Sequence, residues 1–225
     1  MTISVLYRDE VLLAVDKPSG MLVHRGWSKD GPILVDEVRA LLGVETVHPV
    51  HRLDRQTSGV VLFALNPEIA KTVAAAFEAG VVEKTYWALV RGEAPEKGEI
   101  DHPVPRTEGG PRVPAVSRFH RLAVLETEPR HTSWMCVYPK TGRFHQVRRH
   151  MKHLGHPIIG DANYGKGDLN RAFRERYGLT RTALHAAALS IPHPVNMNPL
   201  TIAAPLPSDL AAPLTRMGLL RDIGK

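Results

Sequence analysis

The stretch HRLDRQTSGVVLFAL, residues 51–65, joins a polar loop to a continuous apolar run. Residues 60–65 contain no polar side chain and follow turn residues, so we expect a buried strand there. Hydroxyl groups and a glycine at residues 57–59 are typical of a tight loop that leads into such a strand. The loop holds one carboxylate, Asp54, between two arginines. These residues alone allow a surface ion pair, a turn or a reactive group.

Strand-like and helical segments continue on both sides of this stretch. Strands are expected at residues 3–7, 11–15, 81–90, 115–126, 132–138, 184–191 and 200–204, with a turn at 17–20. Helices are expected at residues 33–42, 67–79, 141–154 and 168–177, the second capped by Asn66 with Pro67 at its first position. Residues 102–114 are expected to form a loop, because six of the thirteen are Pro or Gly. Strands outnumber helices without regular alternation, which favours an α+β fold with a mixed or antiparallel sheet.

The length of 225 residues allows one large mixed domain or two small ones. The formal net charge of +6 and the pI of about 9.6 suggest a polyanionic partner. The charge is concentrated, since residues 143–181 hold nine basic and three acidic residues, a net of +6. The basic residues are Arg143, Arg148, Arg149, Lys152, Lys166, Arg171, Arg174, Arg176 and Arg181. This cluster predicts a nucleic-acid footprint, and the alternative is an ordinary solvated helix face.

Cysteine content and the N-terminus point to the cytoplasm. Cys136 is the single cysteine and lies in an apolar run. We therefore expect a buried, inert thiol and no disulfide framework. The start MTISVLYRDE has no long apolar segment behind a basic one, and no apolar run approaches membrane-spanning length. We therefore expect a cytoplasmic protein without membrane association.

The helix expected at residues 141–154 has an apolar stripe of Phe144, Val147, Met151 and Leu154 within about 80° of arc. Arg148 lies about 40° from the edge of that stripe, so it needs a buried or half-buried anion as partner. Arg149 and Lys152 lie farther around the helix, at about 80° to 140°, where they can meet phosphate or solvent. The two adjacent arginines are therefore predicted to have different roles, an ion pair at the core for Arg148 and contact with phosphate or solvent for Arg149.

Histidines near this helix raise the alternative of a metal site. The residues concerned are His145, His150, His153 and His156, beside Gln146. His145 and His153 point apart in the helical projection, and no HExxH motif accompanies them, so nucleic-acid contact or plain surface is favoured over a metal. The chain also lacks GxSxG, GxxxxGK[ST] and GxGxxG motifs. These patterns suggest a reaction without cofactor or metal on a charged polymer.

HRLDRQTSG followed by an apolar strand resembles the signature of the RluA family of RNA pseudouridine synthases. The segments VDKPSGMLVH, EKTYWALVRG, PKTGRFHQVRRHMKHLGHPIIGD and LHAAALSIPHP resemble the family's other motifs in the expected order. VHRGWSKD and HPIIGDANYGKGDLNR are most similar to the subgroup that modifies uridine 65 of tRNA. The resemblance implies a mixed, mostly antiparallel sheet of two packed halves with a central RNA-binding cleft. It also implies one catalytic domain over residues 1–225, without the N-terminal S4 domain of many members.

The resemblance implies a role for each matching residue. Asp54 is the catalytic aspartate that acts in breaking the bond between uracil N1 and ribose C1′, and a neighbouring cation favours its ionised form. Arg148 matches the arginine that pairs with this aspartate, and Tyr86 the tyrosine that stacks on the target base. Arg52 matches the residue that fills the stack when the uridine flips out. The alternative for Tyr86 is packing on one face of a strand.

Further residues are predicted to bind RNA, namely His51, Arg143, Gln146, Arg149 and Lys152. The alternative for His51, Arg143 and Gln146 is that they shape the motif loops. Residues 57–59 are expected to be architectural, and Arg55 is expected to form no more than a surface ion pair. The expected partner is RNA, most of all tRNA, with a monomer as the default and no protein partner implied. Ribosomal RNA is the alternative substrate, and a non-catalytic RNA-binding module is the remote alternative from another class.

Overall fold

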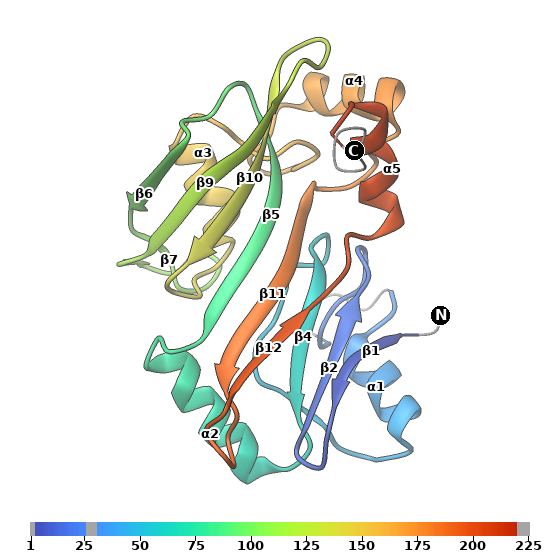
Figure 1. The fold of residues 1–225 in the computed structure, drawn as a ribbon, viewed down its shortest axis with the longest axis vertical. Coiled ribbons are helices and arrows are strands. Elements are labelled where there is room, and N and C mark those ends of the chain that lie inside the picture. Colours follow the sequence, from blue (N-terminus) through green and yellow to red (C-terminus); the bar gives the residue numbers. More distant parts are fainter. Residues whose placement is uncertain (1–2, 26–30, 220–225) are drawn as a thin grey trace. The chain divides into compact units, whose positions relative to one another are not determined.

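The computed structural model describes residues 3–25 and 31–219. It has the α+β architecture that the sequence predicts, with two compact units described separately below (Figure 1). The first unit comprises Met1–Lys84 and Ala186–Pro205, and the second comprises Thr85–His185 and Leu206–Lys225. Residues 26–30, which include Trp27 and most of the VHRGWSKD motif, lie outside the described residues. In the part that is described, no helix combines the length and apolar character that crossing a membrane requires.

The first unit is built on the antiparallel order β1-β2-β4, in which β4 is the strand that follows the HRLDRQTSG motif (Figure 1). The element bounds are β1 Ser4–Arg8, β2 Leu12–Lys17, α1 Leu34–Leu42, β3 His48–Pro49, β4 Ser58–Ala64, α2 Pro67–Glu78, β11 Leu184–Pro192 and β12 Pro199–Ala203. All seven residues of β4 are buried, which confirms the predicted strand. Its Val60 and Leu62 share a core with Leu12 of β2 and Val73 of α2.

Local sequence signals explain where α2 begins. The Asn66 side chain accepts a hydrogen bond from Ile69 N at 2.9 Å, and Pro67 occupies the first helical turn, where its missing N–H costs nothing. The helix ends at Glu78, and Gly80 follows with a left-handed φ of 73°. Both ends of the predicted helix are therefore confirmed.

The second unit contains the antiparallel order β5-β10-β9-β6, packed with three helices (Figure 1). The bounds are β5 Glu83–Arg91, β6 Lys97–Asp101, β7 Val104–Pro105, β8 Arg112–Val113, β9 Val116–Leu125, β10 Thr132–Pro139, α3 Gln146–His153, α4 Gly167–Tyr177 and α5 Ser208–Arg216. Leu89, Met135, Met151, Phe173 and Leu214 bring strands β5 and β10 and all three helices into one core.

The helix expected at residues 141–154 is shorter than predicted, because α3 begins at Gln146. Residues 141–145 form a turn in which Gln146 Oε1 accepts hydrogen bonds from Thr141 Oγ1 at 2.7 Å and Arg143 N at 3.0 Å. His145 precedes the helix with a left-handed φ of 54°, which no helix interior tolerates. The apolar periodicity extended through this turn, so the pattern alone placed the start five residues too early.

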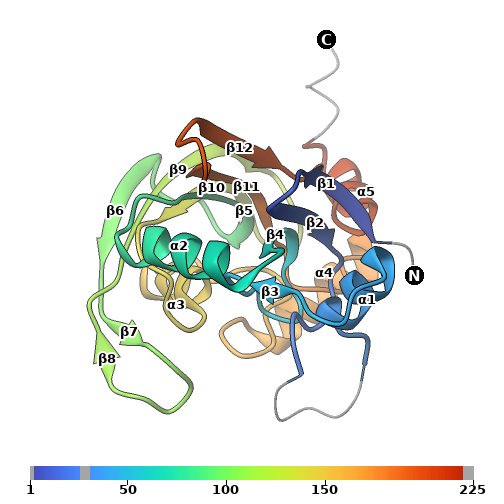
Figure 2. The ribbon, with the colours of Figure 1, turned by 90° about the horizontal axis from the view of Figure 1, so that it is seen from below.

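Three further differences from the sequence prediction concern short or atypical elements. Residues 102–114 contain a two-stranded hairpin of β7 and β8, rather than a loop without a ladder (Figure 2). Strand β6 was not predicted, because Lys97–Asp101 is mostly polar and exposed. Helix α5 was not predicted either, and it carries Pro213 in its interior.

Substitution of Gly59 tests the packing at the start of β4. Gly59 has a φ of 117°, and an added Cβ would lie 2.1 Å from the carbonyl oxygen of Ala186. We expect Gly59→Ala to lower the free energy of unfolding by more than about 3 kcal/mol, measured by urea denaturation. Gly43→Ala is the control, since its φ is 66° but no atom lies within 4 Å of the added Cβ, and it should cost about 1 kcal/mol. Equal losses in the two variants would contradict this explanation.

Candidate active site

The HRLDRQTSG loop is tied to the turn after β2 by a buried lysine. Lys17 is fully buried, and its ammonium donates to the carbonyl oxygens of Pro18 at 2.9 Å, Met21 at 2.8 Å and Arg55 at 3.2 Å. Gly20 N donates to the same Arg55 carbonyl at 2.8 Å, and Arg55 Nε donates back to Gly20 O at 3.0 Å. These bonds hold the segment around Asp54 against the KPSG turn. Arg55 therefore contributes to the structure of the loop.

Asp54 lies at the corner of this loop and is half-buried, whereas Arg52 is exposed. The Asp54 carbonyl accepts a hydrogen bond from Thr57 N at 3.0 Å, which closes a turn just before β4. Thr57, Ser58 and Gly59 are all buried, so their predicted architectural role is confirmed. The loop therefore has a fixed backbone on both sides of the carboxylate.

His51 shapes this loop from the inside. Its Nε2 accepts a hydrogen bond from Leu62 N at 3.0 Å, and its ring centroid lies 5.2 Å from that of Phe77. Burial, with a smaller contribution from the positive charge of Lys84, lowers the pKa of His51 to about 4. The imidazole is therefore neutral at physiological pH and acts as an acceptor. This geometry favours the loop-shaping alternative over direct RNA contact.

In the second unit, Arg148 is buried on α3 and forms a two-point ion pair with Asp161. Arg148 Nε donates to Asp161 Oδ2 at 2.7 Å, and Arg148 Nη2 donates to Asp161 Oδ1 at 2.9 Å. The helical position of Arg148 predicted a buried or half-buried anion as its partner, but it did not identify Asp161, which lies in the loop after α3. The two parallel hydrogen bonds from a guanidinium fork to one carboxylate give this pair both strength and a fixed orientation.

The backbone around Asp161 reinforces its charge. Asn163 N and Tyr164 N donate to Oδ1 at 2.9 and 3.0 Å. Burial of Asp161 opposes ionisation, but the hydrogen bonds and charge of Arg148, together with these N–H groups, hold the pKa of the carboxyl below its usual value. The pair is therefore charged at neutral pH, and Arg148 has a fixed orientation.

Tyr86 lies on β5 in the second unit, opposite Val137 of β10. Its side chain is half-buried and packs against the apolar core of this unit. The packing role that was the alternative for Tyr86 is therefore present in the structure. Partial exposure leaves room for a second role, and stacking on a base stays a prediction.

The remaining predicted RNA-binding residues lie on and before α3. Gln146 is buried, and its amide nitrogen donates to Val116 O at 3.0 Å and Ser117 Oγ at 3.1 Å. With the two bonds that its oxygen accepts, Gln146 orders the turn before α3, in keeping with the loop-shaping alternative. Arg143 Nε donates to Pro114 O at 3.4 Å, Arg149 is half-buried and Lys152 is exposed.

Histidines of this region make contacts within the protein. His150 is buried between Ser117 Oγ at 2.9 Å and the His102 carbonyl oxygen at 2.9 Å. His153 stacks on His102 with ring centroids 3.7 Å apart, and His156 Nδ1 lies 2.8 Å from Arg91 O. Among residues 3–25 and 31–219, no group of three or more His, Cys, Asp or Glu side chains is placed to hold a metal ion.

The basic cluster of residues 143–181 is partly internal. Besides Arg148, Arg181 is buried, and it donates to both carboxylate oxygens of Asp209 at 3.1 and 3.2 Å. Arg171, Arg174 and Arg176 are exposed on α4. The surface charge available to a polyanion is therefore smaller than the sequence count suggests.

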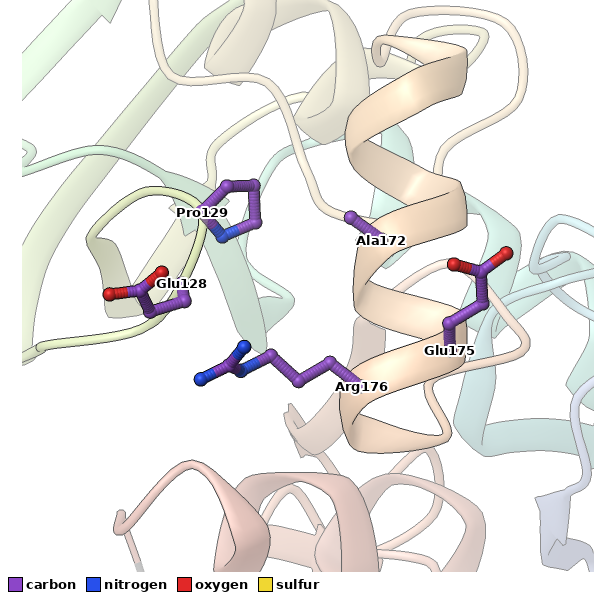
Figure 3. A pocket seen from close by; sticks show the side chains of 5 residues that line it. All are labelled: Glu128, Pro129, Ala172, Glu175 and Arg176. Atoms are coloured by element: carbon purple, nitrogen blue, oxygen red, sulfur yellow. The ribbon is translucent and has the colours of Figure 1, made fainter.

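A cavity of about 390 Å³ lies beside α4. It is lined by Glu128, Pro129, Ala172, Glu175 and Arg176 (Figure 3). Arg176 belongs to the basic cluster predicted to contact nucleic acid, but none of the residues predicted individually to act in catalysis or RNA binding lines the cavity. Its mixture of two carboxylates and one guanidinium gives it no single sign of charge.

Comparisons of sequence and of fold with known proteins give consistent results. A family model described as RNA pseudouridylate synthase matches residues 11–153. The chain is 43% identical to tRNA pseudouridine synthase C of Haemophilus ducreyi and 41% identical to that of Vibrio cholerae, each over 91% of both chains. Two solved human structures are similar to its fold. RNA pseudouridylate synthase domain containing 4 has a TM-score of 0.76 at 25% identity, covering 96% of this chain and 93% of that one. RNA pseudouridylate synthase domain containing 1 has a TM-score of 0.77 at 28% identity, covering 93% of this chain and 87% of that one.

Asp161→Asn tests the contribution of the buried pair to stability. Breaking a buried ion pair costs about 3–5 kcal/mol, so we expect a loss of that order in the free energy of unfolding at pH 7. The control is Asp36→Asn, because Asp36 pairs with Arg25 at 3.2 Å on an exposed surface and should cost about 1 kcal/mol or less. Because the folded pKa of Asp161 is lowered, the difference between wild type and Asp161→Asn should shrink as pH falls below about 4. A loss no greater than that of the control would contradict a stabilising pair.

The lowered pKa of His51 predicts a second pH dependence of the free energy of unfolding. Its folded pKa of about 4 lies below the ordinary value of 6.5, so stability that is present above pH 6.5 is lost as pH falls toward 4. The unfolded chain takes up the proton first, and the loss from this group between pH 7 and pH 5 should be about 2 kcal/mol. In His51→Gln, unfolding measured at both pH values should show a correspondingly smaller difference. Identical pH dependence in the two proteins would refute the assignment.

Proposed function

Because the chain belongs to the RNA pseudouridylate synthase family, we propose that it converts a uridine of tRNA to pseudouridine. Family membership makes it an isomerase that acts on uridine in RNA. The observation that carries the proposal is that the family match, residues 11–153, contains Asp54, Tyr86 and Arg148 together. The choice of tRNA as substrate is supported by the name that the curated relatives share.

We propose uridine 65, in the acceptor and T-stem region, as the target. The support is the similarity of residues 23–30 and 156–171 to the subgroup that modifies this position. Ribosomal RNA is the alternative substrate for the same chemistry. Mapping of pseudouridine in total RNA from cells with and without this protein separates the two, since only the true target loses its modification.

Asp54 is proposed to carry the chemistry. The bond between uracil N1 and ribose C1′ breaks, the base rotates, and a bond from C5 to C1′ forms. The proton lost from C5 balances the proton gained at N1, so substrate and product are isomers and no oxidant, cofactor or metal is consumed. An ionised carboxylate serves this reaction as nucleophile or base. The fixed backbone on both sides of Asp54 supports such a role.

Arg148 is proposed to be the cation that pairs with Asp54 and keeps it ionised. Its burial and its fixed orientation beside Asp161 support the assignment, because a guanidinium with a set direction can hold a carboxylate in place. The pair with Asp161 uses Arg148 Nε and Nη2 and gives the guanidinium the fixed direction that the proposed role needs.

Tyr86 and Arg52 are proposed to handle the flipped base. Extrusion of a base costs a few kcal/mol of unstacking, and an aromatic ring that stacks on the base offsets part of that cost. The half-buried ring of Tyr86 suits this contact, and the exposed guanidinium of Arg52 can fill the vacated stack and bind phosphate. His51, Arg143, Gln146, Arg149 and Lys152 are proposed to support RNA binding, the first three through the order of the loops. We also propose a cytoplasmic monomer with one catalytic domain.

Asp54→Asn tests the proposed function. The amide keeps the size of the side chain but removes its charge, so the variant should fold and bind RNA and lose pseudouridine formation by at least about a thousandfold. The assay is pseudouridine formation in an unmodified tRNA transcript, with thermal melting and transcript binding measured alongside. Asp36→Asn, the same change on the exposed face of α1, should keep wild-type activity. Wild-type turnover by Asp54→Asn would overturn the role of Asp54, whereas no turnover by the wild-type protein would favour a non-catalytic RNA-binding module.

A further inference from the structure

The ring of Tyr164, in the loop between α3 and α4, is surrounded by cations. Arg148 Cζ lies 5.0 Å from the ring centroid, Arg149 Cζ 5.1 Å and Lys152 Nζ 5.7 Å. Cations within about 6 Å of an aromatic centroid are attracted by the ring quadrupole. One half-buried tyrosine therefore gathers three positive side chains from a single helix.

Several contacts hold the ring in this position. Tyr164 N donates to Asp161 Oδ1 at 3.0 Å, and the hydroxyl lies 3.0 Å from His145 Nδ1. The His145 ring stacks on Phe144 with centroids 3.8 Å apart, and Arg149 Cζ lies 5.7 Å from the Phe144 centroid. Arg149 is therefore in contact range of two aromatic rings, each of which is fixed by its neighbours.

Charge is unbalanced around this ring. Asp161 matches Arg148, but within residues 3–25 and 31–219 neither Arg149 nor Lys152 has a carboxylate within 4.0 Å. Arg149 Nε is buried and, over the same residues, has no hydrogen-bond partner. Two like charges three residues apart on a helix repel each other. The arrangement holds two cations together at a cost that an anion between them would remove.

We propose that Arg149, Lys152 and Tyr164 form a binding site for a backbone phosphate of the RNA substrate. The inference rests on the proposed function, which supplies RNA as the ligand, and adds a specific anchor for it. A phosphodiester carries one negative charge and oxygen acceptors that suit a guanidinium beside an ammonium. Tyr164 acts as a positioning residue, because cations already held over its ring lose less freedom when the phosphate binds.

Salt dependence of RNA binding tests the two cations. Binding of an unmodified tRNA transcript is measured at several KCl concentrations for wild type, Arg149→Gln, Lys152→Gln and the control Lys71→Gln, which removes an exposed charge from α2. Each of the first two should weaken binding about tenfold and reduce the slope of log K against log salt by about one. In steady-state assays the loss should fall on KM rather than kcat. Slopes no different from that of Lys71→Gln would overturn the site.

Tyr164 is tested by a matched pair of variants. Tyr164→Leu keeps both cations but removes the ring, so it should weaken binding several-fold while changing the salt slope less than Arg149→Gln does. Tyr164→Phe keeps the ring and should weaken binding less than Tyr164→Leu. Equal effects of the two would overturn the role of the ring, provided that melting temperatures show both variants folded. A reduced slope in the cation variants combined with no pseudouridine formation by the wild-type protein would reject the proposed function and leave the phosphate site standing.

Discussion

The buried ammonium of Lys17 is the interaction on which the candidate active site depends. One lysine, removed from solvent, binds three backbone carbonyl groups from two segments that are far apart in the sequence. An ammonium has three donors, and each carbonyl that it binds would otherwise need another partner. This arrangement fixes the loop that carries Asp54 without using the side chain of Asp54 itself. Lys17 is therefore part of the scaffold beneath the proposed chemistry.

Local signals made much of this fold predictable. The apolar run of β4 and the cap at Asn66 are each set by neighbouring residues, and both predictions hold. The burial of Arg148 was also predictable, although the helix begins later than expected, because the angles from Arg148 to Val147 and Met151 lie within the true helix. Asp161 could not be identified as a partner, since its position depends on a loop of the tertiary fold. Lys17 gave no signal either, because lysine is rarely buried and patterns assign it to the surface.

The count of basic residues at 143–181 overestimated the exposed positive charge for a related reason. A charge count treats every cation alike, but Arg148 and Arg181 are buried in ion pairs that belong to the core of the second unit. Gln146 and His51 show the same effect for neutral polar groups, since each was a candidate for RNA contact and each bonds to the protein backbone. The sequence pattern marked a candidate region, and burial divides its residues between scaffold and surface.

Because Arg148 is paired with Asp161, the two neighbouring arginines of α3 respond differently to the pH and the ionic strength of the solvent. A buried pair is shielded from dissolved ions, so its geometry changes with acidity, when the carboxylate takes up a proton, and hardly with ionic strength. Arg149, one residue later, has no such partner among the described residues and is half-buried, so part of its side chain remains open to solvent and its ions. Two neighbouring arginines on one helix therefore respond to different properties of the medium, one to pH and the other to salt.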